Sequence, residues 1–562
     1  MKRNILVVTL LICFYQSFSQ SPELTAMNAA LQKAIGPVQA ASKSYEPKYA
    51  LIQPAVIQYS YDEIDSKGNR TNYVYEVNVS DLDPYAVREL TQKDLITVVL
   101  AVKNKQKLVK VLKNNEVLPY DDQALIIAKD IENARQISEA IKKAIPSAEK
   151  VMANRLKLSG YDAMVNWITT NVKDVTIGTK SFKQTVTKGD KVGVVKFTLV
   201  EADAKTSVEE IYTFNLSDIN PNRINYKISG NRFGVEFETL QDAKFIAVTR
   251  NGETKPFIND LVINTNNVDE ARDLKNVLAL AAPLAIEKVK ADIPAPASEK
   301  DALAKLGALT TSITIGQKEI AQSLETSCLC QLTQVEKDAK TSTKNVFKFN
   351  WIDVNAIGSK IDVSGDRMFI EVNTNENKKL IMQTENEKFK AYENSIRIYM
   401  PSVENARRGK VAIDKAVEKC KAVYKEPFGN DAAGIFSWIT KNIKDVSIDE
   451  TTFKQKFEAV DAGKVNKVKY TRTEVNTKGS GAEEVYEFNL SDISPLTVEV
   501  EVRGKWLYVS METDFKGKII KYYKDGKIMP YTAKIDFVIN DVDTSRNMVS
   551  AFQKLVKTQK AK

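Results

Sequence analysis

The chain matches itself four times in a fixed register. In each copy, an Asn near the end of an apolar stretch is followed 57 residues later by an Arg, and the copies recur every 135 to 139 residues. The pairs are Asn78 with Arg135, Asn215 with Arg272, Asn350 with Arg407, and Asn489 with Arg546. A period this long matches a whole small domain and exceeds the roughly 20 to 50 residues of a solenoid repeat. We therefore expect four tandem domains of one design.

Breaks in composition place the domain boundaries. Ser159-Gly160, the segment from Pro294 to Pro296, and the segment from Pro427 to Asn430 carry turn-forming residues between periodic stretches. We expect a signal peptide at 1–19, then repeat units at 20–159, 160–293, 294–427 and 428–562. Units 2 and 4 share a Trp-Ile-Thr motif, at Trp167 and Trp438, which indicates duplication of a two-domain block.

Each unit has the pattern of an α+β domain. Positions 18, 20 and 22 after the anchor Asn are apolar in all four copies, and a period of two is typical of a strand with one buried face. A turn pair such as Asn251-Gly252 follows, and then an aromatic residue that we expect to plug the core. The aromatic residues are Tyr120, Phe257, Tyr392 and Tyr531. The whole unit is predicted as a short N-terminal helix, about seven antiparallel strands and a C-terminal helix.

The C-terminal helix has a start signal in every unit. Five residues before the Arg stands a residue suited to cap a helix: Asp130, Asn267, Ser402 and Asp541. An acid two residues later complements the positive end of the helix dipole. Apolar residues such as Ile137 and Ile141 then recur at helical spacing. We expect this helix to cover the sheet.

Antiparallel strands followed by a capping helix resemble the pleckstrin-homology-like (PH-like) superfold, a bent barrel or sandwich closed by its C-terminal helix. The resemblance covers the four units and consists of element order, without a diagnostic motif. It implies an anion-binding first hairpin, because many such domains bind phosphoinositide headgroups there through basic residues. The lysines near the corresponding loops are Lys188, Lys191, Lys196, Lys464, Lys467 and Lys469.

The N-terminus is predicted to direct export. Lys2 and Arg3 precede an apolar run, and Ser17 and Ser19 form a small-residue cleavage site. No later stretch reaches the roughly 18 apolar residues of a membrane span, so we expect a periplasmic or extracellular protein with no transmembrane span. The net charge of +9 is diffuse, which argues against a nucleic-acid partner.

The chain contains no histidine. This excludes Ser-His-Asp and Cys-His catalysis and the usual zinc, copper and haem sites. Glycine-rich phosphate loops and the Gly-x-Ser-x-Gly elbow are also missing from the sequence. We expect no cofactor, no bound metal and no catalytic residues.

An Asp follows each anchor Asn by three residues: Asp81, Asp218, Asp353 and Asp492. The strand end and the helix start of each unit could meet through this Asp and the unit's Arg, in the bidentate geometry of carboxylate and guanidinium. The expected pairs are Asp81 with Arg135, Asp218 with Arg272, Asp353 with Arg407, and Asp492 with Arg546. We favour this structural clamp over a recurrent ligand pocket, because structural ion pairs recur wherever a fold does. The anchor Asn residues of units 1, 2 and 4 also match the N-glycosylation pattern, but core-strand ends favour a structural use.

The three cysteines beyond the N-terminal segment all lie in unit 3: Cys328, Cys330 and Cys420. Cys328 and Cys330 share one face of a strand, and Cys420 lies on the closing helix, so an exported protein could link Cys420 to either of them. Buried thiols are the alternative. A metal site is less favoured, because three thiolates without histidine make an incomplete ligand set.

These observations predict a non-enzymatic exported multidomain protein that acts as a binding or scaffold module of the cell envelope or extracellular space. Its partner would be a protein or a glycan, and four linked domains would raise the effective concentration for a repetitive partner. One alternative is a histidine-free periplasmic or secreted hydrolase that uses paired carboxylates. Another is a weak binder of anionic lipid surfaces through the lysine-rich hairpins, which would make membrane contact peripheral at most. An enzyme should gather acids with shifted pKa in one cleft.

Overall fold

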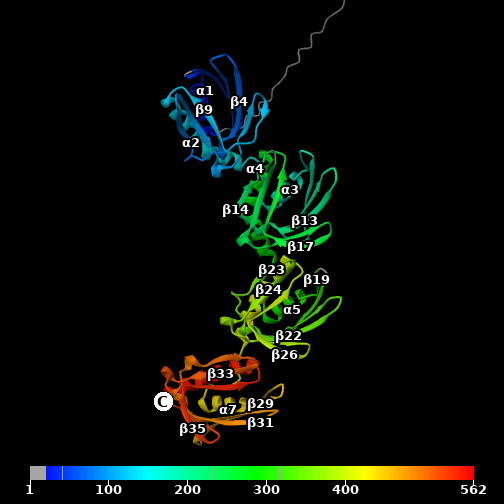
Figure 1. Ribbon diagram of the computed structural model, residues 1–562, viewed down its shortest axis with the longest axis vertical. Coiled ribbons are helices and arrows are strands. Elements are labelled where there is room, and N and C mark those ends of the chain that lie inside the picture. Colours follow the sequence, from blue (N-terminus) through cyan, green and yellow to red (C-terminus); the bar gives the residue numbers. More distant parts are fainter. Residues whose placement is uncertain (1–20, 41, 231, 316–317, 462, 562) are drawn as a thin grey trace, which may run out of the picture. The chain divides into compact units, whose positions relative to one another are not determined.

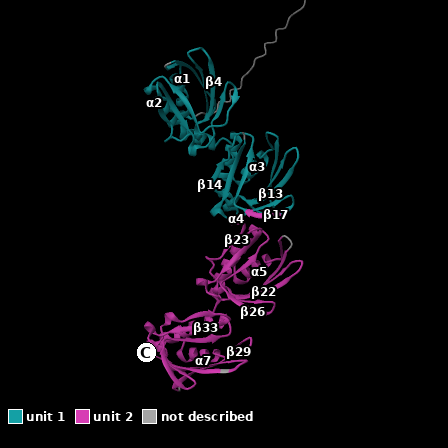
Figure 2. Ribbon diagram, in the orientation of Figure 1, with its two compact units in different colours: residues 1–253, 258–289 teal, residues 254–257, 290–562 magenta. Residues whose placement is uncertain are grey.

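The computed structural model describes residues 21–40, 42–230, 232–315, 318–461 and 463–561, so the expected signal peptide at 1–19 lies outside the described residues. The chain forms four copies of one α+β module (Figure 1). These lie in two compact units, residues 1–253 with 258–289 and residues 254–257 with 290–562 (Figure 2). Unit 1 holds repeats 1 and 2, and unit 2 holds repeats 3 and 4. No helix in the described part of the chain is long and apolar enough to cross a membrane.

Unit 1 contains the following elements, apart from residues 254–257 of β17, which belong to unit 2. Repeat 1 comprises α1 (Pro22–Ala34), β1 (Val38–Ala40), β2 (Lys43–Gln53), β3 (Val56–Ile64), β4 (Arg70–Asn78), the 3-10 turn η1 (Val79–Asp81), β5 (Arg88–Gln92), β6 (Leu95–Ala101), β7 (Lys110–Lys113), β8 (Glu116–Val117), β9 (Gln123–Ala128) and α2 (Ile131–Ala153). Repeat 2 comprises α3 (Tyr161–Asn171), β10 (Val175–Ile177), β11 (Lys180–Lys188), β12 (Val194–Ala202), β13 (Ser207–Asn215), η3 (Leu216–Asp218), β14 (Ile219–Tyr226), β15 (Phe233–Thr239), β16 (Ile246–Arg250), β17 (Glu253–Ile258), β18 (Asp260–Thr265) and α4 (Val268–Asp292).

Unit 2 repeats the same order. Repeat 3 comprises α5 (Glu299–Leu309), β19 (Ile313–Ile315), β20 (Lys318–Leu324), β21 (Leu329–Lys337), β22 (Ser342–Asn350), η5 (Trp351–Asp353), β23 (Lys360–Ser364), β24 (Arg367–Asn373), β25 (Ile381–Glu385), β26 (Lys388–Glu393), β27 (Ser395–Tyr399) and α6 (Val403–Val423). Repeat 4 comprises α7 (Ala432–Asn442), β28 (Val446–Ile448), β29 (Thr451–Asp461), β30 (Lys464–Asn476), β31 (Gly479–Asn489), η7 (Leu490–Asp492), β32 (Glu499–Arg503), β33 (Trp506–Glu512), β34 (Ile520–Lys524), β35 (Lys527–Thr532), β36 (Lys534–Ile539) and α8 (Val542–Lys560).

Each repeat has two antiparallel sheets, of six and three strands. In repeat 2 the larger sheet has the order β10-β11-β12-β13-β16-β17, and the smaller has the order β14-β15-β18. Nine strands therefore replace the expected seven or so, because the first strand and the seventh and eighth strands add to the larger sheet. Within the described residues no hydrogen-bonded ladder joins the two sheets, so the module is not a closed barrel.

Both helices of a repeat contribute to one core together with both sheets. The first helix packs on the larger sheet and the closing helix packs on the smaller sheet. The two helices of a repeat also contact each other, in repeat 2 through Lys288 of α4 and Asp162 of α3. In repeat 4 the core joins Ile439 of α7, Phe457 and Tyr470 of the larger sheet, Phe537 of the smaller sheet and Phe552 of α8. The expected cover of the sheet by the closing helix is confirmed.

The predicted helix caps and turns are confirmed by their hydrogen bonds. Asp130 Oδ1 accepts the N–H of Asn133 at 2.7 Å, and Asn267, Ser402 and Asp541 cap α4, α6 and α8 in the same way. Asn251 has φ 50° and also accepts the N–H of Glu209 at 3.0 Å, which explains why Asn or Asp recurs there. Gly252 follows with φ 80°, where a side chain would be strained.

In repeats 1, 2 and 3 the anchor Asn is a cap as well, whereas Asn489 of repeat 4 makes no cap hydrogen bond. Asn78 Oδ1 accepts the N–H of Ser80 at 3.0 Å, and Asn215 does the same for Ser217 at 2.9 Å, so each starts the 3-10 turn that follows its strand. Both side chains are buried. This structural use is the one that the sequence favoured over glycosylation.

A buried glutamine joins the two sheets of a repeat, and sequence reasoning missed it. Gln184 Nε2 donates to the carbonyls of Lys173 and Asn264, and its Oε1 accepts the N–H of Asn264 at 2.9 Å. Gln455 makes the corresponding bonds to Lys444 and Val538 in repeat 4. Such a fully satisfied amide fixes the spacing of the sheets.

Candidate functional site

The recurrent Asp and Arg join two repeats of unit 1. Arg272, near the start of α4 in repeat 2, places Nη2 2.5 Å from Asp81 Oδ2 of repeat 1, and its Nε donates to Asp81 Oδ1 at 3.3 Å. Arg272 also contacts Asp269, three residues before it. The side chains of Arg272 and Asp81 are only 5% and 9% exposed. This pair is a buried, bidentate link between neighbouring repeats.

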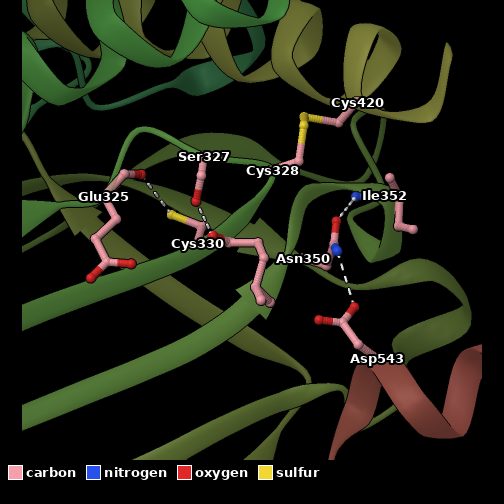
Figure 3. Close-up of a disulfide and its surroundings, with 9 residues drawn as sticks. Glu325, Ser327, Cys328, Cys330, Asn350, Ile352, Cys420 and Asp543 are labelled. Atoms are coloured by element: carbon pink, nitrogen blue, oxygen red, sulfur yellow. Dashed lines mark hydrogen bonds between the residues drawn. A yellow bond between two sulfur atoms is a disulfide. The ribbon is translucent and has the colours of Figure 1, made fainter. Parts of the chain in front are cut away.

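Unit 2 contains the same link. Arg546, near the start of α8 in repeat 4, places Nη1 2.6 Å from Asp353 Oδ2 of repeat 3, and it also contacts Asp543. Asn350 adds a bond across this boundary, from its Nδ2 to Asp543 Oδ1 at 3.0 Å (Figure 3). We call the Asp of one repeat together with the Arg of the following repeat the clasp.

The expectation that the Asp and the Arg of the same repeat pair with each other is therefore wrong wherever their contacts are observed. Arg135 lies on an exposed helix surface and pairs with Glu132 at 2.5 Å, while Asp492 accepts a hydrogen bond from Asn489 at 3.1 Å. Asp81 lies beside the other end of α2, because Lys103 contacts both Ser80, next to Asp81, and Glu149. Arg135 is roughly 20 Å further along that helix, given a rise of about 1.5 Å per residue. The remaining two residues of the predicted set, Asp218 at the end of η3 and Arg407 in α6, are placed at the corresponding positions of their repeats.

The two clasps differ in their electrostatics. Burial acts against the charge of Arg272, but attraction to Asp81 outweighs it and raises the pKa of the guanidinium. In the second clasp, burial raises the pKa of Asp353 to about 6, although attraction to Arg546 opposes the shift. Desolvation therefore limits what each ion pair contributes to stability.

An aromatic residue of the first repeat adds to each clasp. Tyr120 of repeat 1 packs edge-to-face on Phe233 of repeat 2, with ring centroids 5.0 Å apart. Tyr392 of repeat 3 is 4% exposed and lies close enough to Asp541 of repeat 4 for that carboxylate to raise its pKa, after burial. Tyr531 of repeat 4 is 43% exposed. Tyr120 also packs against the core cluster of repeat 1, as expected of a core plug, whereas the exposure of Tyr531 contradicts that expectation in repeat 4.

A recess of about 260 Å³ lies beside the clasp of unit 1. Lys275 lies 4.5 Å from the centroid of the Tyr226 ring, and burial lowers the pKa of this lysine. Lys103 bridges to Glu149 at 2.5 Å on the other side. The two lysines that line the recess are thus each matched by a carboxylate or an aromatic face, as expected for an interface between two folded repeats.

The cysteines form the predicted type of bond. Cys328 and Cys420 are joined by a disulfide, with Cα atoms 5.7 Å apart, and this bond ties the start of β21 to α6 (Figure 3). Cys330 is a buried free thiol whose Sγ lies 3.2 Å from the carbonyl oxygen of Glu325. Among the described residues, no cluster of three or more His, Cys, Asp or Glu side chains could hold a metal ion.

The six lysines of the predicted anion site lie on two hairpins. Lys188, Lys191 and Lys196 surround the connection between β11 and β12, and Lys464, Lys467 and Lys469 follow the connection between β29 and β30. Lys188, Lys191 and Lys196 are all exposed. Their role in binding lipid or other anions stays a prediction.

A polar cleft of about 320 Å³ opens between the two sheets of repeat 4. Arg472 of β30 holds Glu484 Oε2 with Nε at 2.8 Å and Nη2 at 2.6 Å. Across the cleft, Arg503 of β32 holds both oxygens of Asp536, at 2.6 and 3.0 Å. The lining includes three cations and three carboxylates: Arg472, Arg503, Lys524, Glu474, Glu484 and Asp536. The cleft is therefore polar without a strong net charge.

Aromatic rings complete the walls of this cleft. The guanidinium of Arg503 lies 4.7 Å from the centroid of the Tyr508 ring, and that of Arg472 lies 6.0 Å from the ring of Phe453. Burial opposes ionisation of Asp536, but hydrogen bonds from Arg503 and Ser510 hold its pKa below the usual value. The carboxylate is thus a stable acceptor at neutral pH and not a proton donor.

Sequence reasoning missed this cleft, although a comparison of the repeats contains its signal. The cross-strand pair of Arg472 and Glu484 corresponds to Tyr61 and Tyr73 in repeat 1, to Leu199 and Glu210 in repeat 2, and to Gln334 and Asn345 in repeat 3. Position by position, Asp536 corresponds to Leu125, Val262 and Arg397. The combination of an arginine at the place of Arg472 with a carboxylate at the place of Asp536 is therefore found in repeat 4 alone among these aligned positions.

Comparison with known proteins returned no match, whether to a protein-family model, to a curated protein or to a solved structure.

Proposed function

We propose that this protein is a non-enzymatic, exported binding and scaffold protein, in which paired repeats form the scaffold and the cleft of repeat 4 takes the ligand. The observation that carries this proposal is the restriction of Arg472, Arg503 and Asp536 to one repeat of four. Repeat 2 keeps a carboxylate and a ring, with Glu210 at the place of Glu484 and Phe182 at the place of Phe453. Repeats 1 to 3 nevertheless keep the fold without the two arginines and Asp536, so fold stability does not require these three residues. A site that the fold does not need is a candidate for binding.

The chemistry of the cleft favours a glycan. Sugar hydroxyls both donate and accept hydrogen bonds, and the cleft offers guanidinium donors beside carboxylate acceptors. The Tyr508 and Phe453 rings supply apolar faces, which suit the C–H surface of a sugar ring. The volume of about 320 Å³ fits a short segment of an oligosaccharide and not a folded protein domain.

The distribution of acids supports binding over hydrolysis. A glycosidase needs one carboxyl group with a raised pKa beside an ionised one. The pKa values of Asp536 and of Glu501, which also contacts Arg503, are lowered. Burial raises the pKa of Asp273 and Asp353, but these residues lie at repeat boundaries and pair with Arg155 and Arg546.

Two further observations support the wider proposal. The disulfide between Cys328 and Cys420 is of a kind that persists in oxidising compartments, which agrees with export by the basic and apolar N-terminus. We also propose that the module is a variant of the PH-like fold, because it has two antiparallel sheets followed by a closing helix. The N-terminal helix and the additional strands would be elaborations of that fold.

The proposal is tested by titrating the full mature chain with neutral, acidic and amino-sugar oligosaccharides in a calorimeter. We expect saturable binding of one class. Arg503→Lys should weaken it by about tenfold, because a single ammonium cannot replace the bidentate contact with Asp536 and a charge-assisted hydrogen bond contributes roughly 1.5 kcal/mol or more.

Ser364→Ala is the matched control, because Ser364 holds the place of Arg503 in repeat 3. It should leave affinity unchanged. Equal losses from both variants, or no binding by any oligosaccharide, would contradict the glycan site. Release of shortened sugars would favour the hydrolase instead.

A further inference from the structure

The two clasps of the chain are built from equivalent parts. The first repeat supplies the acceptor face, which contains the Asp after the anchor Asn and the aromatic residue at the place of Tyr120. The second repeat supplies the donor face, which contains the Arg of the closing helix and the acid three residues before it. The donor helix of unit 1 also buries Val268, 6% exposed, in the core of repeat 1. Leu108, which lines the recess of this clasp, is 6% exposed, and its equivalent Leu380 in repeat 3 is 7% exposed.

Repeat 4 presents the same acceptor face uncovered. Ile519 is 52% exposed at the place of Leu108 and Leu380, and Tyr531 is 43% exposed at the place of Tyr120 and Tyr392. Phe515 is fully exposed at the place of Asn104, which lines the recess of the first clasp. Asp492 lies at the end of η7, at the place of Asp81 and Asp353. An apolar patch around a carboxylate is thus exposed where the other two acceptor faces are covered.

Repeat 1 presents the complementary donor face uncovered. Arg135 is held by Glu132 in the arrangement that Arg272 and Arg546 have with their acids, yet its side chain is 58% exposed. Ile131 is 39% exposed at the place of Val268. The guanidinium and the apolar side chain that fill a clasp are therefore both present and exposed on α2.

We propose that the occupant of the acceptor face of repeat 4 is repeat 1 of a second copy of this chain, bound head to tail. Asp492 pairs with Arg135 of the second copy, and Phe515, Ile519 and Tyr531 cover its Ile131. Continuity with the two clasps inside the chain and the charge complementarity of the two faces support this occupant. A head-to-tail contact is heterologous, so it produces a ring when it closes and a filament when it does not. The inference does not depend on glycan binding.

The test uses the full mature chain in analytical ultracentrifugation over a concentration series at low salt. We expect the average mass to rise above that of the monomer with concentration, because the contact between copies lacks the tether that joins repeats 1 and 2. Asp492→Arg and Arg135→Asp should each weaken association by at least about tenfold, since like charges then face each other. An equimolar mixture of the two variants should associate again, because each variant supplies the face that the other needs.

Tyr531→Ala should weaken association, and Leu496→Ala is its matched control. Leu496 is 90% exposed, and Tyr85 and Ile357, at the same place in repeats 1 and 3, are 95% and 97% exposed, so this position lies outside the clasp. A monomer at every concentration overturns the proposal. Association that survives both charge reversals, or that fails to return in the mixture, overturns the head-to-tail pairing. Thermal melting of each variant verifies that it is folded.

Discussion

The acid response of unit 2 should be dominated by one carboxyl group in the clasp. Burial raises the pKa of Asp353 to about 6, from an ordinary 3.8, although Arg546 opposes the shift. The folded protein therefore binds more protons than the unfolded chain between about pH 4 and 6. Stability from this group is present at low pH and is lost as the pH rises through 6. The difference corresponds to up to about 3 kcal/mol between pH 4 and 7.

The perturbation is Asp353→Asn, which keeps a polar side chain of the same shape but cannot ionise. We expect the free energy of unfolding of the wild type to fall between pH 4 and 7 relative to that of the variant. The assay is urea unfolding of the full chain at several pH values, with the unfolding of η5 and α8 monitored by hydrogen exchange. Parallel pH profiles for wild type and variant would refute the account of a desolvated clasp carboxyl group. A relative rise in wild-type stability from pH 4 to 7 would refute its sign.

Three other predictions concern the clasp of unit 1, the disulfide of repeat 3 and the buried thiol of repeat 3. Arg272→Ala should destabilise unit 1 by roughly 3 to 5 kcal/mol, because Asp81 would stay buried without its partner. Arg135→Ala should change stability by less than about 1 kcal/mol in the same urea titration, and similar effects of the two variants would contradict the assignment of the clasp. Cys328→Ser with Cys420→Ser should lower the stability of repeat 3 by up to about 4 to 5 kcal/mol, because the bond closes a loop with a sequence separation of 92, and an unchanged melting temperature would oppose this. Cys330 is buried, and burial raises its pKa to about 12, so it should resist alkylation at pH 8 until the chain unfolds. Rapid alkylation of the native protein, detected by mass spectrometry, would contradict that burial.

Local signals in the sequence predicted local structure well. Asp130 and Asp541 cap their helices because capping depends on a few neighbouring residues. Asn251-Gly252 forms its turn for the same reason. The strand count was too low, because β10 has three residues and β8 has two, which is too short for an alternating pattern to be recognised.

The clasp shows what a repeated sequence leaves undetermined. The residues that bear the charges were predicted, but Asp81 could meet Arg135 or Arg272, since every repeat has the same spacing. Only packing decides between them: the far end of α2 lies beside Asp81, and the start of α4 approaches it. The cleft of repeat 4 was missed for a related reason, because Arg472 and Asp536 are distant in sequence and no motif joins them.

Pairing of repeats agrees with the history that the sequence suggests. Repeats 2 and 4 share the Trp-Ile-Thr motif of Trp167 and Trp438, and these are the two repeats whose arginines enter a clasp. A duplicated two-repeat block would carry its internal boundary with it. We therefore propose that the pair of repeats is the structural unit of the chain, and that the cleft of repeat 4 is an addition to it.

A double-mutant cycle on Asp81 tests this account most directly. Unfolding free energies of unit 1 are measured for Asp81→Ala, Arg272→Ala, Arg135→Ala and the two double variants that contain Asp81→Ala. We predict a coupling of roughly 2 kcal/mol or more between Asp81 and Arg272, and less than about 0.5 kcal/mol between Asp81 and Arg135. Strong coupling of Asp81 to Arg135, or none to Arg272, would contradict the pairing of repeats.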